Sequence, residues 1–537
     1  MRANKVEASP ESGKRPVGSV AEFIHSWRYF LWVLGLILVV VLFYAEENWR
    51  GHWAWERYRR QMSSRGEPLD LSAFIPPRVP DDQNFAQTPF LAPLFDFIPG
   101  SQRWVGSNPV QRVSGFAHKY DAASGVLDLP KVMRSNSWIN ARTDLAAWYA
   151  AFLSATNRSH ARSAAPQGAL AASLSPEQAA AGILRELSEC DSILREAQDA
   201  SRRPYCRFNL RYEEENPAGI LLPHLAVLKR ICQVLQLRAS ARLALNQTED
   251  AYKDLQLMLY VSRACRQEPT IISQLVSMAE FYLALQPFAE GFGQWSEPQL
   301  RELQDTLGQL NFCADVQRSL AAERGFGCAI IEYLRRSMDK PNQLGNVSGG
   351  PQDGPVGLLM AAGPDGWVDL EKLNYCRFVS DSILPAIDVA GQRINPTTVH
   401  ISREQLSALA GHSGMALYLR HRFFCSLLVP GIEGTLRKAA FGQNAANVAL
   451  IACALERYRL SHGQMPQSLD ALVPEFVAKI PHDIINGEAL KYRLAGPEHY
   501  VLYSVGWNAV DDGGTVGVKK VGEDVAAEQG DWVWQLP

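Results

Sequence analysis

The sequence predicts a mainly α-helical protein, with one transmembrane helix near the N-terminus, a helical-bundle body and a small α+β module at the C-terminus. Three observations support this fold class. An uncharged apolar run occupies residues 29–45. Apolar residues recur at spacings of three and four over much of the stretch from 143 to 460, which is the period of an amphipathic helix. The clearest strand-like alternation lies after residue 490.

The N-terminal part predicts a membrane anchor behind a disordered tail. Residues 1–27 are polar and contain prolines and glycines, so we expect no fixed structure there. The anchor, residues 28–45, contains the run "YFLWVLGLILVVVLFYA", which spans about 26 Å as a helix, against a hydrocarbon core of ~30 Å. A cleaved signal peptide is the alternative. The charged, bulky sequence "AEENWRG" that follows has no A-x-A cleavage site and argues against it.

The charges that flank the anchor do not decide its orientation. Five Lys and Arg residues precede the span and five follow within twenty residues, so the positive-inside rule is balanced. We expect the N-terminus in the cytoplasm, because long following domains translocate largely regardless of charge. The opposite orientation, with the bulk of the chain in the cytoplasm, stays open.

Residues 46–140 predict a juxtamembrane helix and then a strap. The helix is expected to continue to the helix-stopping residues Gly66 and Pro68. The segment "FIPPRVPDDQNFAQTPFLAPLFDF" is rich in proline and aromatic residues, which favours an extended strap over the core. Residues 99–140 alternate weakly, and we expect irregular structure with two strands.

Helices predominate from there to residue 438. The body, residues 141–338, contains one hairpin, "ARLALNQTEDAYKDLQLML", that is similar to a tetratricopeptide repeat. No 34-residue period recurs, so an ordinary helical bundle is the alternative. Residues 339–367 are rich in glycine and proline and predict a long surface loop. Residues 368–438 continue the helices.

Residues 439–537 predict the α+β module. A helical apolar stripe ends at Gly463, a residue type that commonly follows the end of a helix. A short second helix is stopped by Pro474. The segments "KYRL" and "HYVLYS" then alternate as two strands of a hairpin.

This module resembles the globular head of the major pseudopilin of type II secretion systems. The matching motifs are Y-x₄-G-x₂-P-x₂-L-x₂-L-V-P, I-P-x-D and the closing S-x-G…G-G, at Tyr458, Gly463, Pro466, Leu469, Leu472, Val473, Pro474, Ile480, Pro481, Asp483, Ser504, Gly506, Gly513 and Gly514. Asn508 and Ala509 stand where the family has aspartate and glycine. No prepilin peptidase site precedes the apolar run, so the resemblance implies a reused docking unit or folding cap rather than a pilus subunit.

The resemblance also implies calcium in the loop "YSVGWNAVDDGG". Calcium takes six to eight oxygen ligands at about 2.3–2.6 Å. The residues that could supply them are Asn508, Asp511, Asp512, Asp531 and Ser504. The alternative is that these side chains only accept hydrogen bonds from the backbone of a glycine-rich turn.

Composition and missing motifs exclude several function classes. The net charge is −3 and no basic stripe is present, so no nucleic-acid partner is predicted. Neither a phosphate-binding G-x-x-x-x-G-K-[ST] loop nor a G-x-G-x-x-G fingerprint occurs, so no nucleotide is predicted, and no catalytic residue is identified. None of the nine cysteines forms a C-x-x-C pair. We expect buried thiols, with one or two disulfides as the alternative in an oxidising compartment.

These observations favour a non-catalytic scaffold or interaction protein of the bacterial inner membrane, with the bulk of the chain in the periplasm. The expected partners are the membrane and another envelope protein, and the resemblance implies a link to secretion. Two alternatives stay open: an envelope hydrolase whose site is assembled from dispersed residues, and a solute-binding helical module. An exposed apolar patch, a pocket of convergent carboxylates or an enclosed apolar cavity would separate them.

Overall fold

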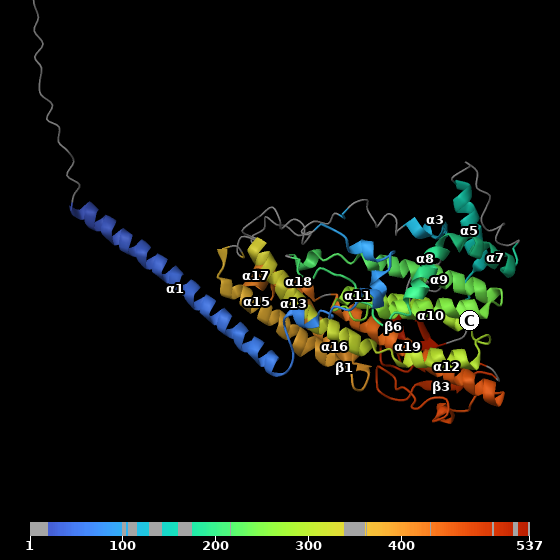
Figure 1. The fold of residues 1–537 in the computed structure, drawn as a ribbon. Coiled ribbons are helices and arrows are strands. Elements are labelled where there is room, and N and C mark those ends of the chain that lie inside the picture. The colour runs from blue at the N-terminus through green and yellow to red at the C-terminus, as the bar shows by residue number, and fades with distance from the viewer. Residues whose placement is uncertain are drawn as a thin grey trace, which may run out of the picture.

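The computed structural model describes residues 20–98, 104–105, 115–127, 142–158, 174–214, 216–337, 360, 362–429, 431–496, 499–518 and 525–534. Across these residues the chain is mainly helical. A long apolar helix extends from one end of the body, and small sheets lie in the C-terminal part (Figure 1). This agrees with the predicted fold class at that level.

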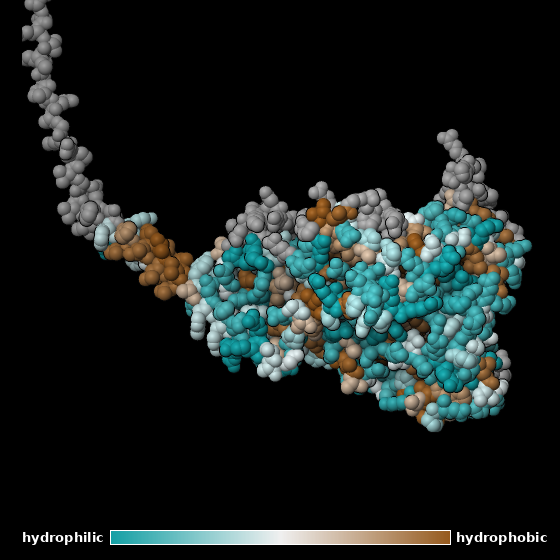
Figure 2. Space-filling model, in the orientation of Figure 1, coloured by the Kyte–Doolittle hydropathy of each residue, from teal (hydrophilic) through white to brown (hydrophobic). Residues whose placement is uncertain are grey.

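Helix α1 (Val20–Ser64) is a single helix of 45 residues. Its first half extends away from the body, and Figure 2 shows it as an apolar rod. The large apolar side chains from Trp27 to Tyr44 are exposed. The helix begins at Val20, so the predicted boundary between tail and anchor at residue 28 is too late, because no glycine or proline separates Val20 from the apolar run.

The segment predicted as an extended strap forms a series of 3₁₀ turns. These are η1 (Leu71–Phe74), η2 (Asp81–Gln83), η3 (Phe85–Gln87) and η4 (Ala92–Phe95). Phe85, Leu91 and Leu94 are fully buried. The prediction of strands after residue 99 is wrong for residues 115–127, which form η5 (Gly115–Ala117) and helix α3 (His118–Val126). Tyr120 and Ala123, three residues apart, bury one face of that helix.

The helical body consists of α5 (Leu145–Arg158), α7 (Pro176–Leu187), α8 (Asp191–Ala200), α9 (Pro223–Ala244), α10 (Thr248–Ala264), α11 (Ile271–Glu290), α12 (Glu297–Gly308) and α13 (Phe312–Ser337). Helices α9, α10 and α11 pack on one another. Residues 309–311 separate α12 from α13. The tetratricopeptide-like character of the α9–α10 hairpin stays a prediction.

Among the residues that the structure describes, two helical segments are long and apolar enough to cross a membrane, Trp27–Ser64 and Pro217–Ala244. They differ in their surroundings. The second contains α9, which buries side chains such as Leu228, Ile231 and Leu235 against its neighbours. Its apolar character is therefore explained by the core of the body, whereas no residue in the apolar window of α1 is buried by the described part of the chain.

The chain from residue 365 to 428 is helical with one short hairpin. It forms α15 (Asp365–Phe378), a π-turn η9 (Val379–Ile383), η10 (Leu384–Ala386), β1 (Ile387–Asp388), β2 (Arg393–Ile394), α16 (Pro396–Ala410), α17 (Gly414–Leu419) and α18 (Phe423–Leu428). The β1–β2 hairpin interrupts the helices that were predicted to continue over residues 368–438. Most of the predicted loop at 339–367 lies outside the described residues, but α15 begins inside it.

The C-terminal part contains α19 (Ile432–His462), η11 (Leu469–Leu472), β3 (Lys491–Leu494), β4 (Tyr500–Ser504), β5 (Val516–Val518), β6 (Val525–Gly530) and β7 (Trp532–Trp534). Gly463 ends α19 in the left-handed conformation, as expected. The two predicted strands pair antiparallel, β7 adds to the other edge of β4, and β5 pairs with β6. Helix α19 packs on α12 and α13, so this part shares its core with the body.

All nine cysteines are free thiols, and eight of them are buried, which agrees with the expectation of small apolar core residues. The closest pair joins α13 to α15, with 3.4 Å between the sulfur atoms of Cys328 and Cys376.

A buried ion pair links α9 to α10. The Asp254 carboxylate is fully buried and accepts hydrogen bonds from the Arg238 guanidinium at 2.6 and 3.0 Å and from Arg242 at 2.6 Å. Removing one partner of such a pair leaves a buried charge without compensation.

We predict that Asp254→Ala lowers the free energy of unfolding by about 3–5 kcal/mol, because two arginines lose their carboxylate. Denaturant unfolding of the full chain in detergent, followed by circular dichroism, measures the change. Asp250→Ala is the matched control. This half-exposed residue forms a surface ion pair with Lys253, 3.0 Å away, and its removal should change stability by about 1 kcal/mol or less.

Candidate functional site

The second half of α1 enters the body beside the start of α15, and this junction is the candidate site. Asn48 accepts a hydrogen bond from the Gly366 backbone N–H at 2.9 Å through its side-chain oxygen. Pro364, the residue before α15, provides no side-chain cap. Asn48 therefore satisfies one of the free amide groups at the start of α15, although it belongs to another helix.

A buried carboxylate reinforces the same contact. Glu47 is 8% exposed and accepts a hydrogen bond from the Trp367 indole N–H at 2.9 Å and another from Arg50. Burial favours the protonated carboxyl, but the hydrogen bonds from Arg50 and Trp367 outweigh burial and lower its pKa. The negative charge also lies beside the N-terminus of α15, where the helix dipole favours it.

Two glycines allow the backbones of α1 and α15 to touch. A methyl carbon placed on Gly51 would overlap the carbonyl oxygen of Gly366, and one placed on Gly366 would overlap the carbonyl oxygen of Glu47. No residue with a side chain fits at either position unless the helices separate. Gly35, in the apolar half of α1, has no atom within 4 Å of such a carbon.

The contact continues along the rest of α1. Trp55, Tyr58 and Met62 are buried against the body. The Lys372 ammonium of α15 lies 4.9 Å from the centre of a Trp55 ring, and the Tyr58 hydroxyl is 3.2 Å from that of Ser380. Polar and aromatic contacts thus fix α1 to α15 over several turns.

The junction also fixes where the apolar rod leaves the body. The rings of Phe43 and Trp367 meet edge to face with centroids 6.3 Å apart, and the Tyr44 hydroxyl donates to the Ala362 carbonyl oxygen. The start of α15 therefore lies level with the last apolar turn of α1. Beyond that turn, the exposed rings of Trp49 and Trp53 stack on the outer face of α1.

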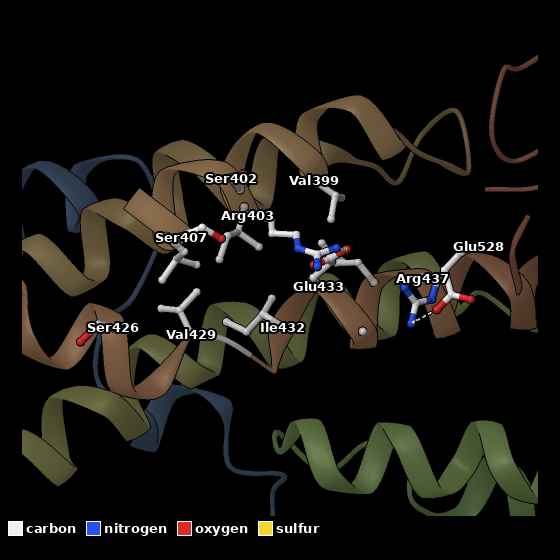
Figure 3. Close-up of a pocket in the computed structure, with 14 residues that line it drawn as sticks. Val399, Ser402, Arg403, Ser407, Ser426, Val429, Ile432, Glu433, Arg437 and Glu528 are labelled. Atoms are coloured by element: carbon white, nitrogen blue, oxygen red, sulfur yellow. Dashed lines mark hydrogen bonds and ion pairs between the residues drawn. The ribbon is translucent and has the colours of Figure 1, made fainter. Parts of the chain in front are cut away.

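A separate groove lies between α16, α18, the start of α19 and β6 (Figure 3). Its volume is about 520 Å³, within the usual range of small-molecule sites. Apolar side chains such as Val399, Leu406 and Ile432 line it. Two ion pairs also lie there, Arg403–Glu433 at 3.4 Å and Arg437–Glu528 at 2.9 Å.

The residues predicted to bind calcium are only partly brought together. Asn508 donates from its amide to Asp512 at 2.9 Å, and the Asp512 backbone N–H donates to Asp531 at 3.2 Å. Asp511 accepts from the Tyr503 hydroxyl at 3.1 Å and from the Gly513 backbone N–H at 3.0 Å. The Ser504 hydroxyl, buried at the end of β4, accepts from the Gly506 backbone N–H.

Backbone amides already occupy the carboxylate of Asp531, which is 1% exposed. It accepts from the N–H groups of Asp512, Gly514 and Thr515. Asp483, equally buried, holds the neighbouring turn by accepting from Ile485 and Val505. In the described ranges no three His, Cys, Asp or Glu side chains are grouped as a metal ion requires. This geometry supports the glycine-turn alternative, and calcium binding stays a prediction.

Buried acids with raised pKa values lie away from the groove. Burial raises the pKa of Glu371 to about 8, although its carboxylate accepts from the backbone N–H groups of Phe423 and Phe424 at 3.1 Å. Burial also raises the pKa of Glu280, which is fully enclosed in the body. Neither residue lines the groove of Figure 3, so neither supports a hydrolytic site there.

The residues of the junction were not singled out in the sequence. Glycine in the middle of a predicted helix is unfavourable by about 1 kcal/mol, so Gly51 was a signal for close packing. Gly366 and Trp367 lay inside the segment predicted as a loop. Comparison of the chain with protein-family models, curated proteins and solved structures finds no match.

We predict that Gly51→Leu destabilises the body by about 1–3 kcal/mol, because the added side chain forces α1 away from α15. Denaturant unfolding measures this change, and faster proteolysis between residues 46 and 66 should accompany it. Gly35→Leu makes the same substitution in the exposed half of α1 and should leave both readouts unchanged. Equal effects of the two variants would contradict the junction.

We also predict that Asp531→Asn lowers stability by about 1–3 kcal/mol without calcium, because one backbone N–H loses its acceptor. Thermal unfolding measures it, with the exposed Glu475→Gln as the control. The same assay with millimolar calcium tests whether the chain binds calcium. A rise in the melting temperature of the wild-type chain that Asp531→Asn abolishes would establish calcium binding.

Proposed function

We propose that the protein is a single-pass membrane protein of the bacterial inner membrane that acts as a non-catalytic scaffold. Its α1 helix spans the bilayer and holds the helical body at the membrane surface, in the periplasm. The body binds another envelope protein. The resemblance of residues 439–537 to the pseudopilin head links this role to secretion.

The observation that carries this proposal is the division of α1 into two halves. The first half exposes every large apolar side chain from Trp27 to Tyr44, which is costly in water and favourable in lipid. The second half is embedded in the body through Glu47, Asn48 and Gly51. A signal peptide passes the same tests of length and composition. Its removal within the helix would cut one continuous element in two, which supports a retained anchor.

The scaffold role follows from how firmly the two halves are joined. An uninterrupted helix fixed to α15 by backbone contact, hydrogen bonds and aromatic packing keeps the body at one distance and one tilt relative to α1. A tether needs no such junction, because a flexible linker would suffice. A fixed orientation is useful when the body presents a surface to a partner in the same membrane.

A second candidate is solute binding in the groove of Figure 3. Its volume of about 520 Å³ and its mixture of apolar and paired charged side chains suit a small amphiphilic molecule. Simultaneous removal of both charged pairs, by Arg403→Ala with Arg437→Ala, would weaken such a ligand and leave membrane attachment unchanged.

Anchoring is tested by washing membrane vesicles with alkaline carbonate. We expect the full-length chain to stay in the membrane pellet, with an intact N-terminus by sequencing. A variant with Leu36→Arg, Val39→Arg and Val40→Arg should be released, because charges at the bilayer centre each cost about 3 kcal/mol. Release of the unmodified chain, or a mature N-terminus beyond residue 45, would contradict the anchor.

The side of the membrane and the scaffold role need separate readouts. Protease added to spheroplasts should digest the body, whereas protease added to intact cells should leave it uncut. This pair of results would place the body in the periplasm. Chemical crosslinking in intact cells should shift the protein to a discrete heavier species that contains a second protein. Recovery of the crosslinked protein only as a monomer would argue against a scaffold.

A further inference from the structure

Helix α17 and the turn after it lie at the end of the body where α1 leaves it (Figure 1). The ring contacts of Trp367 show that α17 lies close to the end of the apolar half of α1. The Trp367 ring meets Phe43, in the last apolar turn of α1, on one side. It also meets the Tyr418 ring at 5.8 Å and the His421 ring at 5.6 Å. One tryptophan therefore separates α17 from the end of the apolar rod.

This short helix exposes two large apolar side chains. Leu417 and Tyr418 are buried against the body, whereas Met415 is 41% exposed and Leu419 is 51% exposed. Exposure of such side chains to water costs free energy in proportion to the exposed apolar area. Because this apolar surface lies close to the end of the proposed transmembrane helix, the bilayer itself can cover it.

The charges around α17 favour a negatively charged surface. Arg420 and Arg422 are exposed, and Arg336 lies at the end of α13. Within the described part of the chain none of these three arginines forms an ion pair, and Arg420 instead bonds the His412 ring at 2.8 Å.

The acids nearby are mostly neutralised. Glu47 pairs with Arg50 and Asp365 with Arg335. Among the described acids at this end, Glu46 and Glu371 form no ion pair; Glu46 is exposed, whereas Glu371 is buried and burial raises its pKa to about 8. Of the exposed, described side chains named here, three arginines and one glutamate lack ion pairs, so their balance is positive, and arginine binds phosphate through two parallel hydrogen bonds.

Two exposed tryptophans complete the pattern on α1 itself. Trp49 and Trp53 stack with centroids 6.4 Å apart, just beyond the apolar run. Tryptophan is enriched where a membrane protein passes through the headgroup layer. Apolar side chains, unpaired arginines and exposed tryptophans thus occur together near the end of the apolar rod.

We propose that this end of the body is a second membrane contact. Met415 and Leu419 insert between the phospholipid headgroups of the bilayer that α1 enters, and Arg336, Arg420 and Arg422 bind the headgroup phosphates. The contact rests on the proposed anchoring by α1. It turns a single-helix attachment into a two-point attachment, which prevents the body from tilting about α1.

Photocrosslinking of the full-length protein tests the contact in vesicles of phosphatidylethanolamine and phosphatidylglycerol. The photoreactive residue p-benzoylphenylalanine replaces Leu419, Ile37 or Leu460, one at a time. Leu460 is the matched control, because it is 48% exposed and lies near the far end of α19. Mass spectrometry after irradiation detects lipid adducts.

We expect lipid adducts at positions 37 and 419 and none at 460. Arg420→Glu with Arg422→Glu should lower the adduct yield at 419 several-fold, because each basic residue near an anionic surface contributes to attraction. The control is Arg195→Glu with Arg202→Glu, on the exposed surface of α8 and the turn after it. This double variant should not change the adduct yield at 419.

The outcomes separate this contact from the anchor. Adducts at 37 without adducts at 419 would overturn the second contact and leave the anchor standing. A protein adduct at 419 in place of lipid would also overturn it. An absence of adducts at 37 would remove the anchor itself, and the second contact with it.

Discussion

The contact between the backbones of α1 and α15 at Gly51 and Gly366 determines how the rest of the molecule meets α1. Because neither residue has a side chain, the helices approach until main-chain atoms touch. That distance brings the Asn48 side chain to the Gly366 N–H and the Glu47 carboxylate to Trp367. A larger residue at either glycine would break all of these contacts together, since each depends on the same helix separation.

The same contact gives the apolar rod a fixed direction. A helix has no internal hinge unless proline, paired glycines or an inserted group opens its hydrogen-bond ladder. No proline interrupts α1, and Gly51, which could have been a weak point, is enclosed by α15. The most flexible residue of the juxtamembrane helix is therefore the one that is held most closely. A movement of the body is therefore transmitted to the apolar half of α1, and a movement of the apolar half is transmitted to the body.

Elements defined by neighbouring residues could be predicted from the sequence, and those defined by distant contacts could not. The continuation of α1 to Ser64 and the strands β3 and β4 follow from local period and from nearby glycine and proline. The β1–β2 hairpin was missed because only two residues pair on each side. The start of α15 was read as loop because its composition is that of a loop. Its cap, Asn48, comes from 318 residues earlier in the chain.

The candidate calcium loop shows the same division between local and distant information. Its glycines and acids are visible in the sequence, and they do form a tight turn. The sequence does not show that the acceptors of the turn are filled by amides. Asp531 receives three backbone N–H groups from a loop that precedes it by about one hairpin, β5 with β6. A carboxylate used in this way stabilises a turn as an ion would, with fewer free oxygens left for a metal.

Helix α19 determines what role the C-terminal module can have. The module was expected to be a docking unit or a folding cap. Its first helix, however, is buried along most of its 31 residues. The Arg457 guanidinium donates to Glu297 at 2.9 Å and to the Phe476 carbonyl oxygen at 3.0 Å, so it joins α12 to the chain after η11. A mobile docking unit would have to expose this helix and leave these buried polar groups without partners, at about 1–3 kcal/mol for each. The burial of α19 therefore favours a folding cap that completes the core of the body.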